Sequence, residues 1–88
     1  MSEWVVYIIE CSDRALYTGI TNDLKRRFKE HKSGVGHFTS YNRPVKLIHT
    51  ESFLNKFDAA IREKQIKGWT HAKKLALAKQ DLVLLKKL

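Results

Sequence analysis

The predicted first helix carries an arginine and a histidine one turn apart, Arg27 and His31. A guanidinium binds phosphate oxygens through paired hydrogen bonds, and an imidazole exchanges protons near neutral pH. Both residues lie beside the apolar stripe of Leu24 and Phe28, so we expect them to face the body of the protein. A function would explain them, because burying unpaired charge is unfavourable. The structural alternative is that Arg27 covers apolar surface with its stem and pairs with Asp23 or another acid.

A carboxylate on a later predicted helix, Glu63, has small neighbours. Ala59 and Ala60 lie one turn before it and leave space beside the carboxylate. The alternative is a surface ion pair with Lys67, one turn later, which stabilises a helix by only roughly 0.3 kcal/mol. The residues alone leave both interpretations open.

Two tyrosines, Tyr7 and Tyr17, occupy adjacent predicted strands at similar distances from the turn that joins them. Their hydroxyls could therefore meet, although the strand register cannot be read from sequence. A buried tyrosine also commonly needs no more than a hydrogen-bond partner. Gly19 would let a backbone or a phosphate come close, or would simply end its strand.

Two strands and a helix must position these side chains. Residues 4–9 are apolar throughout and rich in β-branched and aromatic types, which predicts a central strand buried on both faces. Residues 12–13 supply a turn, and residues 15–20 predict an antiparallel second strand. The helix that follows is expected to be capped by Thr21 or Asn22 and to end at Gly34, with Asp23 in its first turn.

The second half of the chain predicts a strand over 45–52, a helix over 55–67 closed by Gly68, and a third helix capped by Thr70. Residues 81–88 could extend that last helix. The core face of the middle helix is expected to consist of Phe57, Ala60 and Ile61. The order β-β-α-β-α-α predicts an α/β (α+β) fold with a small three-stranded sheet flanked by helices.

The composition fits one small basic domain over residues 1–88. A net charge of +8, spread along the chain, attracts polyanions; nucleic acid is the expected partner, and a membrane surface or an acidic protein is the alternative. The lone Cys11 excludes an intrachain disulfide and a cysteine-rich zinc site. Without a membrane-length apolar run or a secretory pattern, the cytoplasm is the expected location.

In combination, these residues resemble the GIY-YIG nuclease domain over about residues 3–79. Residues 5–7 (Val-Val-Tyr) stand in place of the family's first tripeptide and residues 17–19 (Tyr-Thr-Gly) in place of its second, ten residues later. Residues 23–31 resemble the family helix that carries the arginine and histidine, and residues 60–67 the helix with the metal-binding glutamate. The similarity is closest to the small stand-alone bacterial members and more distant to the nuclease domain of the repair excinuclease.

The chain also departs from the family pattern. Val5 and Thr18 replace residues that give the family its name, and Ile20 stands where excinuclease-type members have a basic residue. No asparagine follows Glu63, although several active branches have one there. These departures put the rate and the metal affinity in question.

The resemblance implies a divalent-metal-dependent DNA endonuclease that acts in DNA repair or processing. Glu63 would hold Mg²⁺ or Mn²⁺, and Arg27 would stabilise the phosphate. Tyr7 would act as general base or relay, which requires nearby positive charge to lower its pKa. Tyr17 would position the water, and His31 would accept or pass the proton or simply hydrogen-bond a tyrosine.

The expected DNA contacts lie on the outer face of the first helix and in the irregular stretch 34–44. They are Lys25, Lys29, Lys32, Thr39 and Arg43. Branched or single-stranded DNA are the expected substrates of a monomer or weak dimer, with a larger repair partner left open. The alternatives are a nucleic-acid-binding module without useful catalysis and an accessory component of a repair complex.

Overall fold

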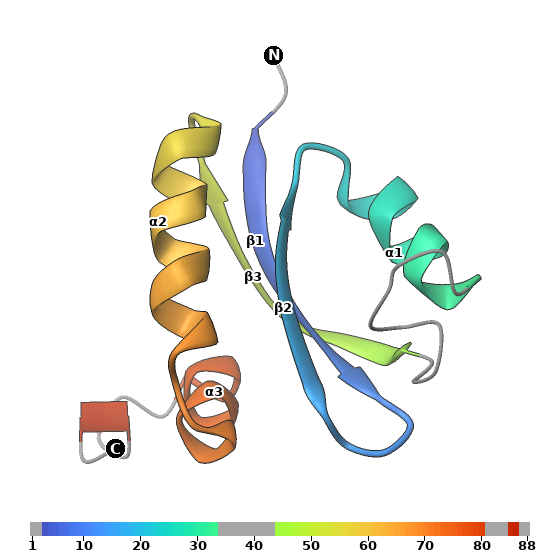
Figure 1. Ribbon diagram of the computed structural model, residues 1–88, viewed down its shortest axis with the longest axis vertical. Coiled ribbons are helices and arrows are strands. Elements are labelled where there is room, and N and C mark those ends of the chain that lie inside the picture. Colours follow the sequence, from blue (N-terminus) through green and yellow to red (C-terminus); the bar gives the residue numbers. More distant parts are fainter. Residues whose placement is uncertain (1–2, 34–43, 81–84, 87–88) are drawn as a thin grey trace.

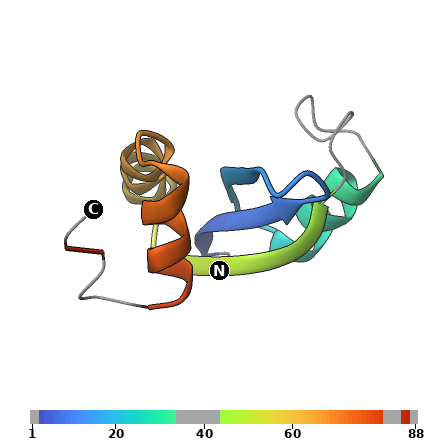
Figure 2. The same ribbon diagram turned by 90° about the horizontal axis from the view of Figure 1, so that it is seen from below.

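The computed structural model describes residues 3–33, 44–80 and 85–86. Three antiparallel strands form a sheet in the order β2-β1-β3. Helix α1 covers one face, and helices α2 and α3 cover the other (Figures 1 and 2). The observed order β-β-α-β-α-α confirms the predicted fold class.

Strand β1 (Trp4–Cys11) is the central strand, as its uninterrupted apolar run predicts. It forms a hairpin with β2 (Leu16–Thr21), in which Tyr7 lies opposite Gly19 and Ile9 opposite Tyr17. Because side chains alternate along a strand, this register puts both tyrosines on the same face of the sheet.

The third strand, β3 (Pro44–Phe53), pairs with the other edge of β1. The register shifts between Ile8 and Ile9 and again between Glu10 and Cys11. Such irregularities increase the local twist of a sheet. The strand is two residues longer than the 45–52 segment expected from sequence.

Helix α1 (Leu24–Lys32) begins one or two residues later than expected. Its cap is Asp23, whose carboxylate accepts the backbone N–H of Arg26. The expectation of a Thr21 or Asn22 cap is wrong, because Thr21 still belongs to β2 and its hydroxyl accepts the backbone N–H of Asp23. The helix is capped at its other end by Ser33, and Gly34 lies outside the described residues.

Helix α2 (Lys56–Lys67) is closed by Gly68 and helix α3 (His71–Ala78) is capped by Thr70, as predicted, whereas Asn55, expected as the first residue of α2, is its N-cap. The side chain of Asn55 accepts the N–H of Asp58, and Thr70 caps α3 in the same way. At the corner between the helices, Trp69 has Arg62 at 5.1 Å and the ammonium of Lys73 at 4.3 Å from its ring centre. The indole ring thus contacts a cation from each of the two helices.

The principal core lies between the sheet and α2 with α3, and is formed by Val6, Ile8, Ala59, Ile66 and Leu77. The expectation that Phe57 and Ile61 face the core is wrong, because these side chains are 74% and 47% exposed. Ala59 and Ile66, two turns apart, face the sheet instead, and the small Ala59 lets the helix approach closely. Ala60 is half-buried.

Candidate active site

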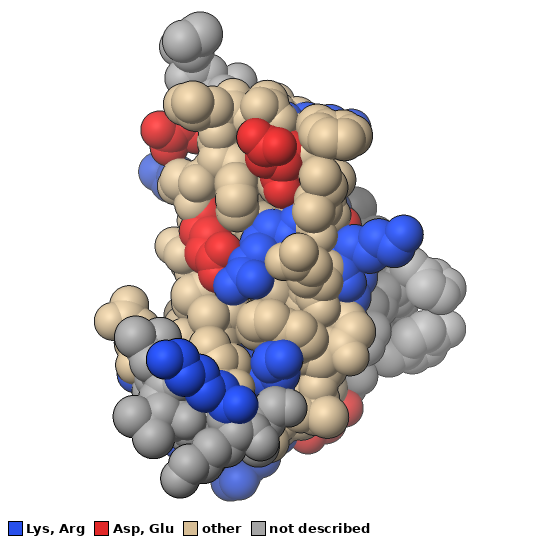
Figure 3. All heavy atoms as spheres, turned by 90° about the vertical axis from the view of Figure 1, so that its left-hand side faces the viewer, with Lys and Arg blue, Asp and Glu red and all other residues tan. Residues whose placement is uncertain are grey.

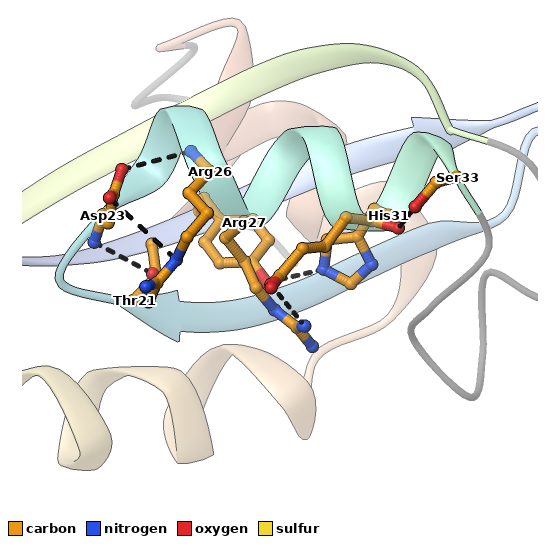
Figure 4. A network of polar contacts seen from close by, with 8 residues as sticks. Thr21, Asp23, Arg26, Arg27, His31 and Ser33 are labelled. Carbon is orange, nitrogen blue, oxygen red and sulfur yellow. Dashed lines mark hydrogen bonds and ion pairs between the residues drawn. The ribbon is translucent and has the colours of Figure 1, made fainter.

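A buried hydrogen bond joins β1 to α1 on the second face of the sheet. The hydroxyl of Tyr7 lies 2.8 Å from Nε2 of His31, and both residues are only 1% exposed. Figure 4 shows the imidazole of His31 on α1, with the guanidinium of Arg27 from the same helix beside it. The helix face predicted to turn Arg27 and His31 toward the sheet therefore does so.

Three rings pack around this hydrogen bond. The ring centre of Tyr17 lies 6.2 Å from that of Tyr7 and 4.9 Å from that of His31. Gly19 makes the arrangement feasible, because a Cβ at this position would stand 2.5 Å from the Tyr7 hydroxyl and 3.0 Å from the Tyr17 ring. The glycine thus serves the close approach of the tyrosines; it does not end its strand, since β2 continues to Thr21.

Arg27 is held in place by an acid on the same helix, Glu30. Its Nη1 donates to Oε1 of Glu30 at 3.2 Å, three residues later, whereas Asp23 pairs with Arg26. Burial acts to lower the pKa of Arg27, but hydrogen bonding to Tyr7 and Glu30 outweighs it and the pKa is raised. Glu30 is the residue of this site that sequence reasoning missed, and its three-residue spacing from Arg27 was the available signal.

The two partners of the buried hydrogen bond are both neutral at physiological pH. Burial raises the pKa of Tyr7 to about 12, although the neighbouring Arg27 acts to lower it. Burial, with the positive charge of Arg27, lowers the pKa of His31 below 6.5. In the protein alone, burial thus outweighs the positive charge that was expected to lower the Tyr7 pKa. A neutral imidazole can instead accept the phenolic proton directly.

Glu63 approaches this site from α2. Burial is the largest cause of the raised pKa of Tyr7, and the charges of Tyr17 and Glu63 raise it further. The Glu63 carboxylate therefore lies within electrostatic range of the Tyr7 hydroxyl. Its Oε2 lies 3.4 Å from Nζ of Lys67, so the expected ion pair is also present. The carboxylate is 20% exposed and Lys67 is 52% exposed. An exposed lysine of this kind adds little stability and yields readily to a competing cation.

The donor set fits a hard divalent cation held by few protein ligands. Within residues 3–33, 44–80 and 85–86, no three His, Cys, Asp or Glu side chains cluster as a ready metal cage. Mg²⁺ is commonly held by one or two carboxylates, with water and substrate phosphate completing its shell. Glu63 could supply such a carboxylate.

The predicted DNA contacts divide into two groups. Lys25, Lys29 and Lys32 are exposed on α1, as expected. Thr39 and Arg43 lie outside the described residues.

None of the helices that the structure describes is long and apolar enough to cross a bilayer.

Comparisons with known proteins agree with this architecture. The family model of the GIY-YIG catalytic domain matches residues 3–76. A UPF0213 protein of Haloquadratum walsbyi is 47% identical over 76 residues, 85% of each chain. A UPF0213 protein of Syntrophus aciditrophicus is 46% identical over 83 residues, 92% of this chain and 95% of the relative.

Two solution NMR structures share the fold. A UPF0213 protein from Bacillus halodurans is 38% identical with a TM-score of 0.57, covering 91% of this chain and 85% of that one. A protein from E. faecalis is 28% identical with a TM-score of 0.64, covering 94% and 90%. With the family model matching most of the chain, and with small relatives of nearly the same extent, this protein belongs to the GIY-YIG nuclease domain family.

Proposed function

We propose that this protein is a divalent-metal-dependent DNA endonuclease that hydrolyses phosphodiester bonds. The buried hydrogen bond between Tyr7 and His31, with Arg27 beside it, is the observation that carries the proposal. Burying a phenol and an imidazole beside a partly buried guanidinium is unfavourable unless the arrangement serves a purpose. Membership of a nuclease family supplies the reaction class.

Phosphodiester hydrolysis needs a place for the phosphate and a cation to balance its charge. Arg27 would bind a phosphate oxygen, because Glu30 already aims its guanidinium and leaves other N–H donors for the substrate. Glu63 would hold Mg²⁺ or Mn²⁺, giving up its contact with Lys67. The bound cation would supply Lewis-acid stabilisation of the phosphoryl charge.

The attacking water must lose a proton, and Tyr7 and His31 can take it together. The Tyr7 oxygen would accept the proton of the water while its own proton passes across the 2.8 Å hydrogen bond to Nε2 of His31. This transfer requires the His31 tautomer that carries its proton on Nδ1. The resulting hydroxide forms the new bond to phosphorus, the bond to the leaving oxygen breaks, and that oxygen takes a proton from solvent. Tyr17, packed on His31, would hold the imidazole in line.

The substrate class follows from charge. The net charge of +8 and the exposed lysines of α1 favour DNA through sequence-independent phosphate contacts. Branched or single-stranded DNA in repair or processing, in the cytoplasm, is the setting we propose. A nucleic-acid-binding module without useful catalysis is the second candidate, and the ion pair that Lys67 makes with Glu63 favours it.

A cleavage assay with a matched control separates these two functions. Wild type, Glu63→Gln and Glu10→Gln are incubated with plasmid, single-stranded and branched DNA in Mg²⁺, Mn²⁺ or EDTA. Glu10 is a partly buried carboxylate paired with Lys46 at the far end of β1. We expect cleavage by wild type and Glu10→Gln, none in EDTA, and binding without cleavage by Glu63→Gln. Equal DNA binding by all three without cleavage would establish the binding module instead.

A further inference from the structure

The outer face of α2 carries large apolar side chains with no cover. Leu54 is 87% exposed, Phe57 74% and Ile61 47%, and only Leu47 joins them as an exposed large hydrophobic residue in the described part of the chain. Phe57 and Ile61 lie one turn apart on the same face of α2, and Leu54 directly precedes the helix cap Asn55. We refer to these three residues as the stripe. Large apolar side chains exposed close together in this way point to an interaction site.

The stripe is flanked by exposed charges, and the Asp58 carboxylate accepts one hydrogen bond, from the Asn55 side chain at 3.1 Å. Asp58 and Lys64 are both exposed, and neither forms an ion pair within the described residues. Figure 3 faces this side of the molecule: most of the acidic atoms that face the viewer lie in its upper half, and most of the basic atoms lie below them. A surface that is acidic at one end and basic at the other complements a copy of itself turned end to end.

We propose that a second copy of this chain docks on this face, with the two α2 helices antiparallel across a twofold axis at Ile61. Asp58 precedes Ile61 by three residues, and Lys64 follows it by three. The antiparallel arrangement therefore puts Ile61 on the partner's Ile61 and Asp58 beside the partner's Lys64. It also puts Phe57 against the partner's Gln65.

The dimer leaves the candidate active site open. Glu63 follows Ile61 by two residues, which turns its side chain by about 200° around the helix axis. Each copy therefore directs Glu63 away from the shared face, and two sites become available to one DNA molecule. One helix pair is a small interface, so a dissociation constant on the order of 100 µM is expected.

The test is sedimentation equilibrium of the full chain without DNA or metal, so its outcome is independent of the proposed nuclease activity. We expect wild type to dimerise with rising concentration and Ile61→Glu to weaken dimerisation by more than about tenfold. Asp58→Lys and Lys64→Asp each set like charges opposite one another and should weaken it by about fivefold. The double variant Asp58→Lys/Lys64→Asp restores both pairs and should return to within about twofold of wild type.

Leu47→Glu is the control, because Leu47 is an exposed apolar residue on β3. It should dimerise as wild type does. All substituted residues are exposed, and circular dichroism confirms that each variant is folded. A wild-type chain that stays monomeric up to about 1 mM, a dimer insensitive to Ile61→Glu, or a double variant no better than the single ones would each overturn the proposal.

Discussion

Two polar networks built around a histidine lie on opposite faces of one sheet. On the α1 face, His31 is bonded to the neutral hydroxyl of Tyr7. On the α2 face, His49 lies 2.8 Å from Glu51, whose carboxylate also accepts two hydrogen bonds from Arg62, at 2.9 and 3.2 Å. The β1 register puts His49 and Glu51 opposite Ile8 and Val6, so they share the core face.

The difference between the networks distinguishes a candidate site from a structural clamp. Around Glu51, a carboxylate, a guanidinium and an imidazole satisfy one another and tie β3 to α2. Around His31, a neutral proton donor and a neutral proton acceptor lie beside Arg27, whose charge is paired with the half-exposed Glu30 rather than with either of them. Substitutions on the two faces should therefore separate activity from stability.

The largest expected effect is on activity at the α1 face. Arg27→Ala should reduce cleavage by about 10³-fold, because it removes the guanidinium that stabilises the phosphate. Its neighbour Arg26 provides the matched control, since it is exposed and paired with Asp23. Arg26→Ala should lose activity only a few-fold, through weaker nonspecific attraction. Single-turnover cleavage rates measure both, and equal losses would remove the special role of Arg27.

The next effect is on stability at the α2 face. Glu51→Gln should lower the free energy of unfolding by about 2 kcal/mol, because it leaves the partly buried Arg62 without its counter-charge. Cleavage per folded molecule should be unchanged. Urea unfolding gives the first quantity, with Glu10→Gln as a control expected to cost less than about 0.5 kcal/mol. If Glu51→Gln has the same free energy of unfolding as wild type, the network around Glu51 does not act as a structural clamp.

The two faces should also differ in their response to pH. Burial lowers the folded-state pKa of His31 below 6.5, so its contribution to stability is complete above about pH 6.5 and is lost as the pH falls toward the folded value. For Glu51, burial acts to raise the pKa but Arg62 and His49 outweigh it and lower it below 4.5, so its contribution is lost only below about pH 4.5. The free energy of unfolding, measured with urea from pH 7 to 4, should depend less on pH between about pH 6.5 and 5 in His31→Gln than in wild type. Glu51→Gln should keep the wild-type dependence in that range.

The smallest expected effect concerns the lysine that competes for Glu63. Lys67→Gln should raise the affinity for Mn²⁺ by about threefold, because an exposed ion pair is weak. Lys79→Gln, an exposed lysine at the end of α3, should leave the affinity as it is. Calorimetric titration compares them, and a weaker affinity in Lys67→Gln would show that Lys67 assists the cation site.

The sequence predicts well what local chemistry determines. The apolar run of β1 and the caps Gly68 and Thr70 need only neighbouring residues to act, and each is found as predicted. The rotation of α2 about its axis was predicted wrongly. The apolar side chains of Phe57 and Ile61 suggest a core face, but Ala59 and Ile66 are the residues that are buried against the sheet.

Long-range contacts account for the rest. Arg62 bonds to Glu51 only because α2 packs beside β3, and no pattern in the local sequence predicts such a pair. The hydrogen bond of Tyr7 with His31 likewise joins residues 24 positions apart. The helix periodicity predicts that His31 faces the sheet, whereas the strand register that brings Tyr7 to it comes only from the fold.

The most direct test of the central claim is the pH dependence of single-turnover DNA cleavage by wild type and Tyr7→Phe in Mn²⁺. If neutral His31 receives the proton through Tyr7, the wild-type rate should rise tenfold per pH unit below the lowered pKa of His31 and be level from about pH 7 to 9. Tyr7→Phe should be slower by about 10²-fold or more across that range. A wild-type rate that still climbs tenfold per unit to pH 9 would instead identify the phenolate of Tyr7, with its pKa of about 12, as the base and would contradict the relay to His31.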